Sequence, residues 1–240
     1  MRCAVMQPAY LPWAGYFNLI SQVDVFVFLD DAQFERGTWQ NRNRVLVAGE
    51  PHWLTVPVIR ELLGTGINAV RTDEKLRWRR KHFDLLRQNY GKHAFGAEML
   101  QISNIVGDQS LAILAELNIR LILYCCERLG ITTPCVRTSE MGILGKRTER
   151  LIKICEHLGC DEYLSPPGAA EYLAADRFVE MTSTRLEFNE YIPETYPQKG
   201  KEQFVSHLSI VDVVAGLGWQ EAGPYVKRSA ALRAVNTTSI

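Results

Sequence analysis

The sequence has no excess of charge of either sign, because its 27 lysines and arginines balance its 27 aspartates and glutamates. Without a net positive field, broad nucleic-acid binding is disfavoured, and phosphate binding would need a local basic cluster. No run approaches the roughly 18 apolar residues that a membrane helix needs. The start, MRCAV, meets polar Gln7 within a few residues and does not read as a targeting segment. We therefore expect a cytoplasmic protein without a membrane or broad nucleic-acid partner.

The cysteines and histidines lack the spacings of metal and redox motifs. The six cysteines form no CxxC pair, and the five histidines form neither HxH nor HExxH. Cys125, Cys126, Cys155 and Cys160 lie in apolar runs without basic neighbours, which predicts structural thiols. A Walker A sequence is also missing. We expect no metal site, and the cofactor stays open between none, ATP with magnesium, and an acyl donor.

Alternating apolar runs and helix-like segments indicate the fold. RCAVM (2–6), a helical stretch (14–22) and VDVFVFLDD (23–31) predict a βαβ unit whose strands are buried on both faces. VLVAGEPHWLTVPVI (45–59) predicts a hairpin, and amphipathic segments make residues 75–130 helical.

After residue 130 the βα rhythm returns. Strands are predicted at 131–139, 160–165 and 184–191, and helices at 147–159, 168–174 and 205–218, before a polar tail. No linker or repeat interrupts the chain. The sequence thus predicts one α/β domain over residues 1–240, with a Rossmann-like (HUP-like), mostly parallel sheet and a helical insertion at about 75–130.

The first candidate site is the loop QPAYLPWAGYF, at the sheet edge where open α/β sheets bind ligands. Gln7 and Tyr10 are catalytic candidates because their polar groups can donate hydrogen bonds to a reacting group. Trp13 offers a stacking face and Tyr16 a hydroxyl for binding, while the prolines preorganise the loop. The alternative is a turn that the prolines shape and under which the aromatic rings pack.

The second candidate is LDDAQFERGTWQNRNRV (29–45), where two aspartates end a buried strand. Asp30 or Asp31 could act as a base, hold an amine or bind magnesium. Strand alternation sends them to opposite sides, which favours Asp31 as the one facing the ligand. A solvated loop with internal salt bridges is the alternative. The candidate binding residues here are Gln33, Trp39, Arg42 and Asn43.

The remaining candidates follow later strands. Lys146 and Arg147 begin a helix that Thr148 can cap, which predicts an anion site. The other binding candidates are Ser139, Ser165, Tyr196 and His207. Because carboxyl ends of parallel strands share one edge, we expect one cleft to gather the following residues: Gln7, Tyr10, Asp30, Asp31, Arg42, Ser139, Lys146 and Ser165.

These motifs together resemble the WbqC-like family over nearly the whole chain: QPAYLPWAGYF, VFVFLDDAQF, WQNRN, WLTVPV, CDEYLSPPG and FVSHLSIVDVVAGLG. The resemblance implies a bacterial cytoplasmic protein of surface-polysaccharide or natural-product biosynthesis, acting on an amino sugar or similar amine. A fainter similarity is to HUP-type nucleotidyltransferases such as pantothenate synthetase. In this chain Trp13 and Tyr16 stand at the positions where the HUP-type pattern carries histidines, and only Gly15 matches that pattern.

The leading interpretation is a small-molecule transferase that attaches an acyl or aminoacyl group to an amine of a sugar or related metabolite. In that case an aspartate would assist the amine and Gln7, Tyr10 or Asn43 would stabilise the oxyanion. The alternative is an ATP-dependent adenylating enzyme of HUP type, with Arg42, Lys146 and Arg147 on phosphates. A third interpretation is a non-catalytic nucleotide-sugar-binding protein.

Overall fold

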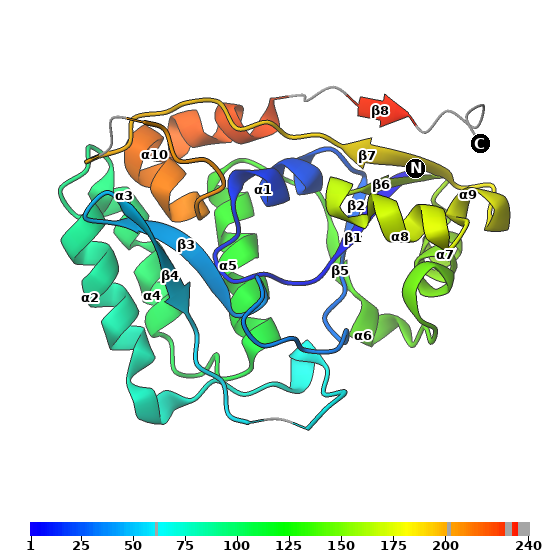
Figure 1. The fold of residues 1–240 in the computed structure, drawn as a ribbon, viewed down its shortest axis with the longest axis horizontal. Helices are drawn as coiled ribbons and strands as arrows, with labels where there is room; N and C mark the ends of the chain where they lie inside the picture. The colour runs from blue at the N-terminus through cyan, green and yellow to red at the C-terminus, as the bar shows by residue number, and fades with distance from the viewer. Residues whose placement is uncertain (61, 201–202, 229–231, 235–240) are drawn as a thin grey trace.

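A computed structural model describes residues 1–60, 62–200, 203–228 and 232–234, and its centre is a mostly parallel sheet (Figure 1). The sheet order is β5-β2-β1-β6-β7-β8. The parallel strands are β1 (Arg2–Met6), β2 (Val25–Phe28), β5 (Cys135–Arg137), β6 (Glu162–Ser165) and β7 (Arg185–Asn189). β8 (Leu232–Ala234) pairs antiparallel with β7. The predicted Rossmann-like α/β fold is confirmed.

The strand order reverses direction between β1 and β6. From β1 the chain builds outward through β2 to β5, and it then returns to place β6 on the other side of β1. Cys3 pairs with Val25 on one side of β1 and with Tyr163 on the other. In doubly wound sheets the carboxyl ends of the strands beside such a reversal form the ligand crevice.

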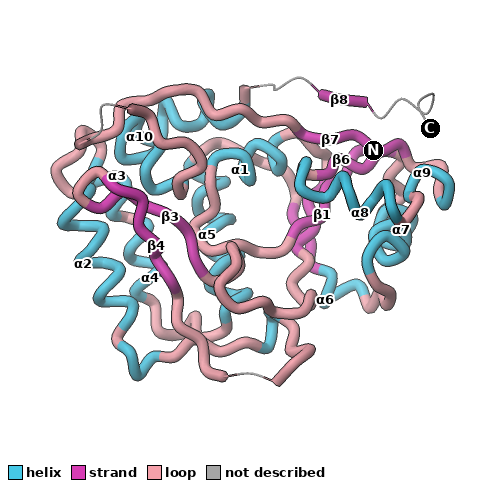
Figure 2. Tube along the Cα trace, viewed as in Figure 1, coloured by secondary structure: helices cyan, strands magenta, loops and turns pink. Residues whose placement is uncertain are grey.

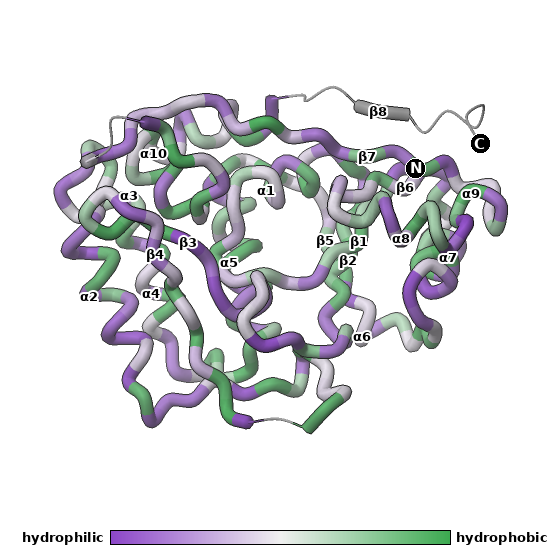
Figure 3. Tube along the Cα trace, viewed as in Figure 1, coloured by the Kyte–Doolittle hydropathy of each residue, from purple (hydrophilic) through white to green (hydrophobic). Residues whose placement is uncertain are grey.

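Helices cover both faces of the sheet (Figure 2). Ala4, Phe26 and Phe28 face the larger core, which also contains residues of α1 (Ala14–Ser21), α5 (Leu114–Arg128) and α10 (Ile210–Lys227). Val5 and Val27 face the smaller core, formed with α7 (Arg147–Leu158), α8 (Ala170–Ala175) and α9 (Phe178–Met181). Hydrophobic residues accordingly dominate β1 and β2 (Figure 3). This two-sided burial explains the continuous apolar runs of the strands.

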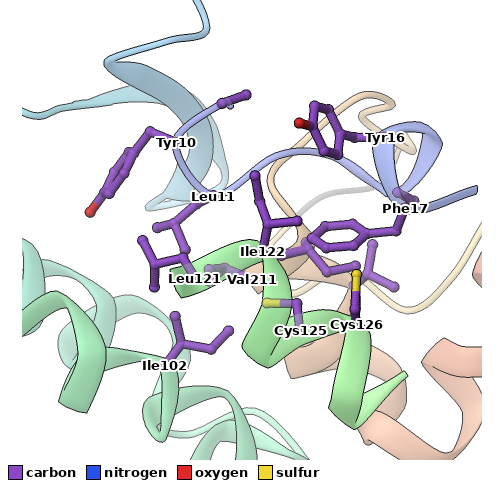
Figure 4. Packing of buried hydrophobic residues seen from close by; sticks show 14 of the residues in the cluster. Tyr10, Leu11, Tyr16, Phe17, Ile102, Leu121, Ile122, Cys125, Cys126 and Val211 are labelled. Atoms are coloured by element: carbon purple, nitrogen blue, oxygen red, sulfur yellow. The ribbon is translucent and has the colours of Figure 1, made fainter. Parts of the chain in front are cut away.

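The larger core holds two of the six thiols (Figure 4). Cys125 and Cys126 lie on α5 among the apolar side chains of Leu121 and Val211. Burial raises the pKa of both thiols well above the usual range, so they stay protonated. This environment agrees with the predicted structural role of these cysteines.

The insertion between β2 and β5 starts with a hairpin and continues as helices. β3 (Arg42–Val47) and β4 (Glu50–Thr55) are joined by a two-residue turn at Ala48 and Gly49.

 The φ angle is 50° at Ala48 and 81° at Gly49, so both residues lie in the left-handed region that a two-residue hairpin turn requires. The hairpin was predicted over residues 45–59, whereas its two strands cover residues 42–47 and 50–55.

Helices follow the hairpin as predicted for residues 75–130. After the short helices η1 (Ile67–Ala69) and η2 (Glu74–Leu76) come α2 (Trp78–Tyr90), α3 (Gly96–Leu100), α4 (Ile102–Gly107) and α5. The hairpin is tied to this layer by the backbone N–H of Leu46, which donates to the Tyr90 hydroxyl at 2.6 Å. The hairpin and the helical layer therefore pack as neighbours (Figure 1).

The last helix differs most from its prediction. It was expected over 205–218, but α10 begins at Ile210, where the Ser209 hydroxyl caps it by accepting from the N–H of Val211, and it ends at Lys227. Gly218 has a non-helical backbone, with φ 70° and ψ 167°, so α10 consists of two helical segments, and the first ends at the predicted position. The predicted polar tail starts later and falls largely outside the described residues. In the described part of the chain, no helix is long and apolar enough to cross a membrane.

Candidate functional site

A cluster of polar side chains lies where β2 and β5 end side by side. Phe28 pairs with Arg137 at the ends of these strands. The chain then turns through Asp30 and Asp31 on one strand, and enters α6 (Thr138–Met141) on the other. The Thr138 hydroxyl lies 2.6 Å from Asp31 Oδ1 and 3.3 Å from Asp30 Oδ1. Both carboxylates therefore meet at one hydroxyl, and their predicted divergence is wrong because β2 stops at Phe28, before strand alternation reaches them.

Asp30 is the buried member of the cluster, with 1% of its surface exposed. Its carboxylate accepts from the Ser139 backbone N–H at 3.0 Å and from the Ser139 hydroxyl at 2.7 Å. Its own carbonyl accepts from the N–H of Asn68 at 2.9 Å. These bonds satisfy Asp30 internally, so its carboxylate holds α6 against the β2 turn.

Asp31 is the accessible member, with 29% of its side chain exposed. Arg150 on α7 donates to Asp31 Oδ2 at 2.6 Å, opposite the Thr138 bond to Oδ1. Burial alone would raise the pKa of Asp31, but the bonds and charge of Arg150 and the Thr138 hydroxyl outweigh it and lower the pKa. Asp31 is thus a fixed, ionised carboxylate with a face open to solvent.

Three glutamines, Gln7, Gln33 and Gln40, link the first loop to the segment that follows Asp31. Gln40 donates to Gln7 Oε1 at 2.8 Å and lies 3.4 Å from the carbonyl of Gln33, while its own Oε1 accepts from the N–H of Glu35. Within the described residues, the amide nitrogen of Gln7 has no hydrogen-bond partner. Gln7 therefore keeps a free donor at the carboxyl end of β1.

The hydroxyls of both tyrosines of that loop are buried and have partners within the protein. The Tyr10 hydroxyl lies 2.9 Å from His82 Nδ1, and burial lowers the pKa of His82 to about 4. The Tyr16 hydroxyl donates to the carbonyl of Gln7 at 3.0 Å. The predicted catalytic role of Tyr10 gives way to a structural one, because its side chain is fully buried.

Two buried asparagines hold the same loop from below. Asn43 donates to the carbonyls of Tyr10 and Leu11 at 3.2 and 2.8 Å. Asn118 donates to those of Pro8 and Gln40 at 3.0 and 2.7 Å. Asn43 therefore braces the loop. These bonds use its amide donor, so they do not support the oxyanion role that the sequence suggested.

Trp13 lies over the start of α1, beside the strand-order reversal. A Cβ on Gly15 would lie 2.3 Å from the Trp13 ring, so only glycine admits the indole there. The ring stacks on His207, with centroids 4.5 Å apart. Trp13 and Gly15 line a small, mostly apolar pocket with Met6, Tyr16, Pro166 and Asn189. This pocket lies at the expected ligand crevice between β1 and β6.

A third feature, the hairpin platform, consists of Trp39, Arg42, Arg44 and Trp53. The two indoles have centroids 5.3 Å apart, and the guanidinium carbon of Arg42 lies 4.0 Å from the Trp53 centroid. His207 packs against Trp13 near this platform, and burial together with the positive charge of Arg44 lowers the pKa of His207.

Other candidates have structural partners outside the cluster of Asp30 and Asp31. Arg147 and the Thr148 hydroxyl both bond to Asp176, and Lys146 rather than Thr148 occupies the N-cap, so the N-cap prediction is wrong. Ser165 is fully buried in β6. The Tyr196 hydroxyl donates to buried Asp212 at 2.8 Å. The contacts therefore join Asp30 to Ser139 directly and to Asp31 through Thr138, and do not show the larger single cleft.

Sequence reasoning missed Arg150, Gln40 and Asn118. Gln40 adjoins predicted residues, so its neighbourhood carried a signal. Arg150 and Asn118 lie within amphipathic helices, where nothing in the spacing separates them from ordinary helix residues. Among the described residues, no group of three His, Cys, Asp or Glu side chains could hold a metal ion.

The fold and this edge cluster define an α/β protein with a Rossmann-like sheet and a polar site at its carboxyl end. The chain belongs to the WbqC-like protein family, whose model matches residues 7–223. It is 32% identical over 236 residues to the uncharacterized protein Rv1507c of Mycobacterium tuberculosis, covering 94% of this chain and 97% of that protein. No solved structure matches. The family resemblance seen in the motifs is thereby confirmed.

Proposed function

We propose that the protein is a small-molecule transferase that attaches an acyl or aminoacyl group to an amine of a sugar or related metabolite, in bacterial polysaccharide or natural-product biosynthesis. The observation that supports this proposal is Asp31, an ionised and partly exposed carboxylate held by Thr138 and Arg150 at the sheet edge. Such a carboxylate suits an amine, because it pairs with an ammonium and keeps accepting sites beside its fixed bonds.

The lowered pKa of Asp31 changes the role expected from the sequence. A carboxylate of low pKa is a weak base, so Asp31 orients the amine and stabilises its charge instead of removing its proton. The ammonium first releases one proton to solvent, and the neutral amine that results attacks the acyl carbon. The new C–N bond leaves positive charge on nitrogen beside Asp31. The bond to the leaving group then breaks, and the nitrogen's proton passes to that leaving group.

The negative charge on the acyl oxygen needs a donor. Gln7 meets this need because its amide oxygen is fixed by Gln40 while its amide nitrogen is free among the described residues. The bond from Gln40 thus holds this donor in place, as preorganised charge stabilisation requires.

An ATP-dependent adenylating enzyme is the second candidate. The pairing of Arg147 with Asp176 weakens it, because that guanidinium is already occupied. Arg42 favours it, because no carboxylate in the described part of the chain pairs with this side chain. ATP with magnesium therefore belongs in any ligand screen.

A thermal-shift screen tests the proposal first. Amino sugars, coenzyme A thioesters, amino acids, nucleotide-sugars and ATP with magnesium are compared, since a ligand at 100 times its Kd stabilises by about 2.7 kcal/mol. Pairs of hits are then incubated together, and mass spectrometry detects a new amide.

The matched variants are Asp31→Asn and Asp108→Asn, the second at an exposed loop position. We expect Asp31→Asn to slow amide formation about a hundredfold to a thousandfold, and Asp108→Asn to leave it unchanged. Equal rates in the two variants would refute the role of Asp31. An ATP-dependent adenylate without amide formation would favour the second candidate.

A further inference from the structure

The hairpin platform combines exposed aromatic rings with arginines on one face of a strand. Trp39 and Trp53 are 49% and 40% exposed, which is unusual for such large apolar rings. Arg42 and Arg44 are two residues apart on β3, so their side chains leave the same face, and Arg44 pairs across the hairpin with Trp53. The four side chains thus form one surface with both stacking faces and positive charge.

Neither arginine has an anionic partner in the described part of the chain. Their Nε atoms are buried and make no hydrogen bond. By contrast, Arg137 and Arg150 pair with Glu116 and Asp31. Two adjacent guanidinium groups without a carboxylate repel each other, and a bound anion would relieve that repulsion.

The stacking of Arg42 leaves its binding edge available. Its guanidinium carbon lies 4.0 Å from the Trp53 centroid, so the indole occupies the face of the group. The N–H donors lie along the edge of a guanidinium, where they match the oxygens of a phosphate in pairs. Trp53 therefore holds Arg42 in place without using the donors that an anion needs.

We propose that the hairpin platform binds the diphosphate of a nucleotide, with Arg42 and Arg44 on the phosphates and Trp39 stacked on the base. Two guanidinium groups match two phosphate groups, and the exposed indole offers the flat apolar face that a base requires. The backbone N–H of Ser209 donates to the Arg44 carbonyl at 2.8 Å, and Ser209 forms a β-bridge with Trp13, which connects the platform to the crevice at β1 and β6. The inference deepens the proposed function, because it gives the substrate or the donor a nucleotide part. The assignment of the platform as a donor subsite rests on that proposed function.

Isothermal titration with UDP, ADP and pyrophosphate tests the binding without an acceptor or a reaction. We expect all three to bind wild-type protein and both nucleotides to bind more tightly than pyrophosphate. Arg42→Gln and Arg44→Gln should each weaken binding about tenfold to a hundredfold, because a charged hydrogen-bond pair is lost. Arg120→Gln, at an exposed position of α5, should not change it.

Trp39→Ala separates the stacking from the charge. It should abolish the advantage of UDP and ADP over pyrophosphate and leave pyrophosphate binding unchanged. Sugar phosphates without a base serve as a further arm, and equal affinity for them and for UDP would overturn the assignment of a nucleotide. If a glutamine variant unfolds, Arg42→Lys and Arg44→Lys keep the charge and lose the paired donors, and they should still weaken binding.

Failure of this inference is distinct from failure of the proposed function. Asp31→Asn should bind UDP as the wild type does, whatever its effect on amide formation. The inference is overturned if wild-type protein binds none of the three anions at millimolar concentration, or if both arginine variants bind them like Arg120→Gln.

Discussion

Replacing Asn118 with alanine tests how the first loop is held. Asn118 donates to the carbonyls of Pro8 and Gln40 at 3.0 and 2.7 Å, and its side chain is fully buried. Each lost bond leaves a buried carbonyl without its donor, at a cost of about 1–3 kcal/mol. The Asn118 carbonyl oxygen is itself buried without a partner, so its removal offsets part of that cost. We expect a net loss of about 2–4 kcal/mol.

Urea unfolding measures this loss, and the melting temperature should fall by about 2–4 °C for each kcal/mol. Hydrogen exchange localises it, because the Tyr10 N–H donates to the Trp39 carbonyl at 3.0 Å in the same junction. That amide should lose protection before the core strands do. Asn104→Ala, at an exposed position of α4, is the control. A loss below about 0.5 kcal/mol in Asn118→Ala would refute the bracing role, since that is the range of ordinary surface changes.

Three further outcomes follow from the structure. Gly15→Ala places a Cβ 2.3 Å from the Trp13 ring, so it should lower the melting temperature and change tryptophan fluorescence, while Gly107→Ala, with open space around it, should do neither. The pKa of Asp31 is lowered in the folded state, so its ionised carboxylate stabilises the fold above the ordinary pKa of about 4. This contribution to the free energy of unfolding is lost as the pH falls through the lowered pKa. The stability difference between wild type and Asp31→Asn should therefore shrink in acid unfolding series. Alkylation of native protein should leave buried Cys125 unmodified, and loss of turnover through that thiol would contradict its structural role.

The strands were predictable because burial on both faces gives a continuous apolar signal. Residues 25–28, VFVF, are buried throughout, and this run stands out in the sequence. The ends of elements were harder to predict. The helix end that the sequence predicts at Gly218 coincides with a break in helical geometry, and a second helical segment, which also packs on the core, carries α10 on to Lys227. That residues 1–240 form one domain stays a prediction.

The candidate site was predictable only as a region. Polar residues after a strand marked Asp30, Asp31 and Ser139, and strand pairing brings them together. Their exact partners depend on tertiary contacts, since Arg150 reaches Asp31 from a distant helix. Buried hydroxyls such as that of Tyr10 look the same in sequence as exposed ones. Spacing therefore found the sheet edge and could not separate binding groups from bracing groups.

The central claim is that Asp31 receives the amine of the substrate. A crystal structure with an amine identified in the thermal-shift screen tests it most directly. The account predicts the amine nitrogen within about 3 Å of an Asp31 carboxylate oxygen, with Thr138 and Arg150 still bonded to that carboxylate. An amine bound elsewhere, with Asp31 contacting only Thr138 and Arg150, would contradict it.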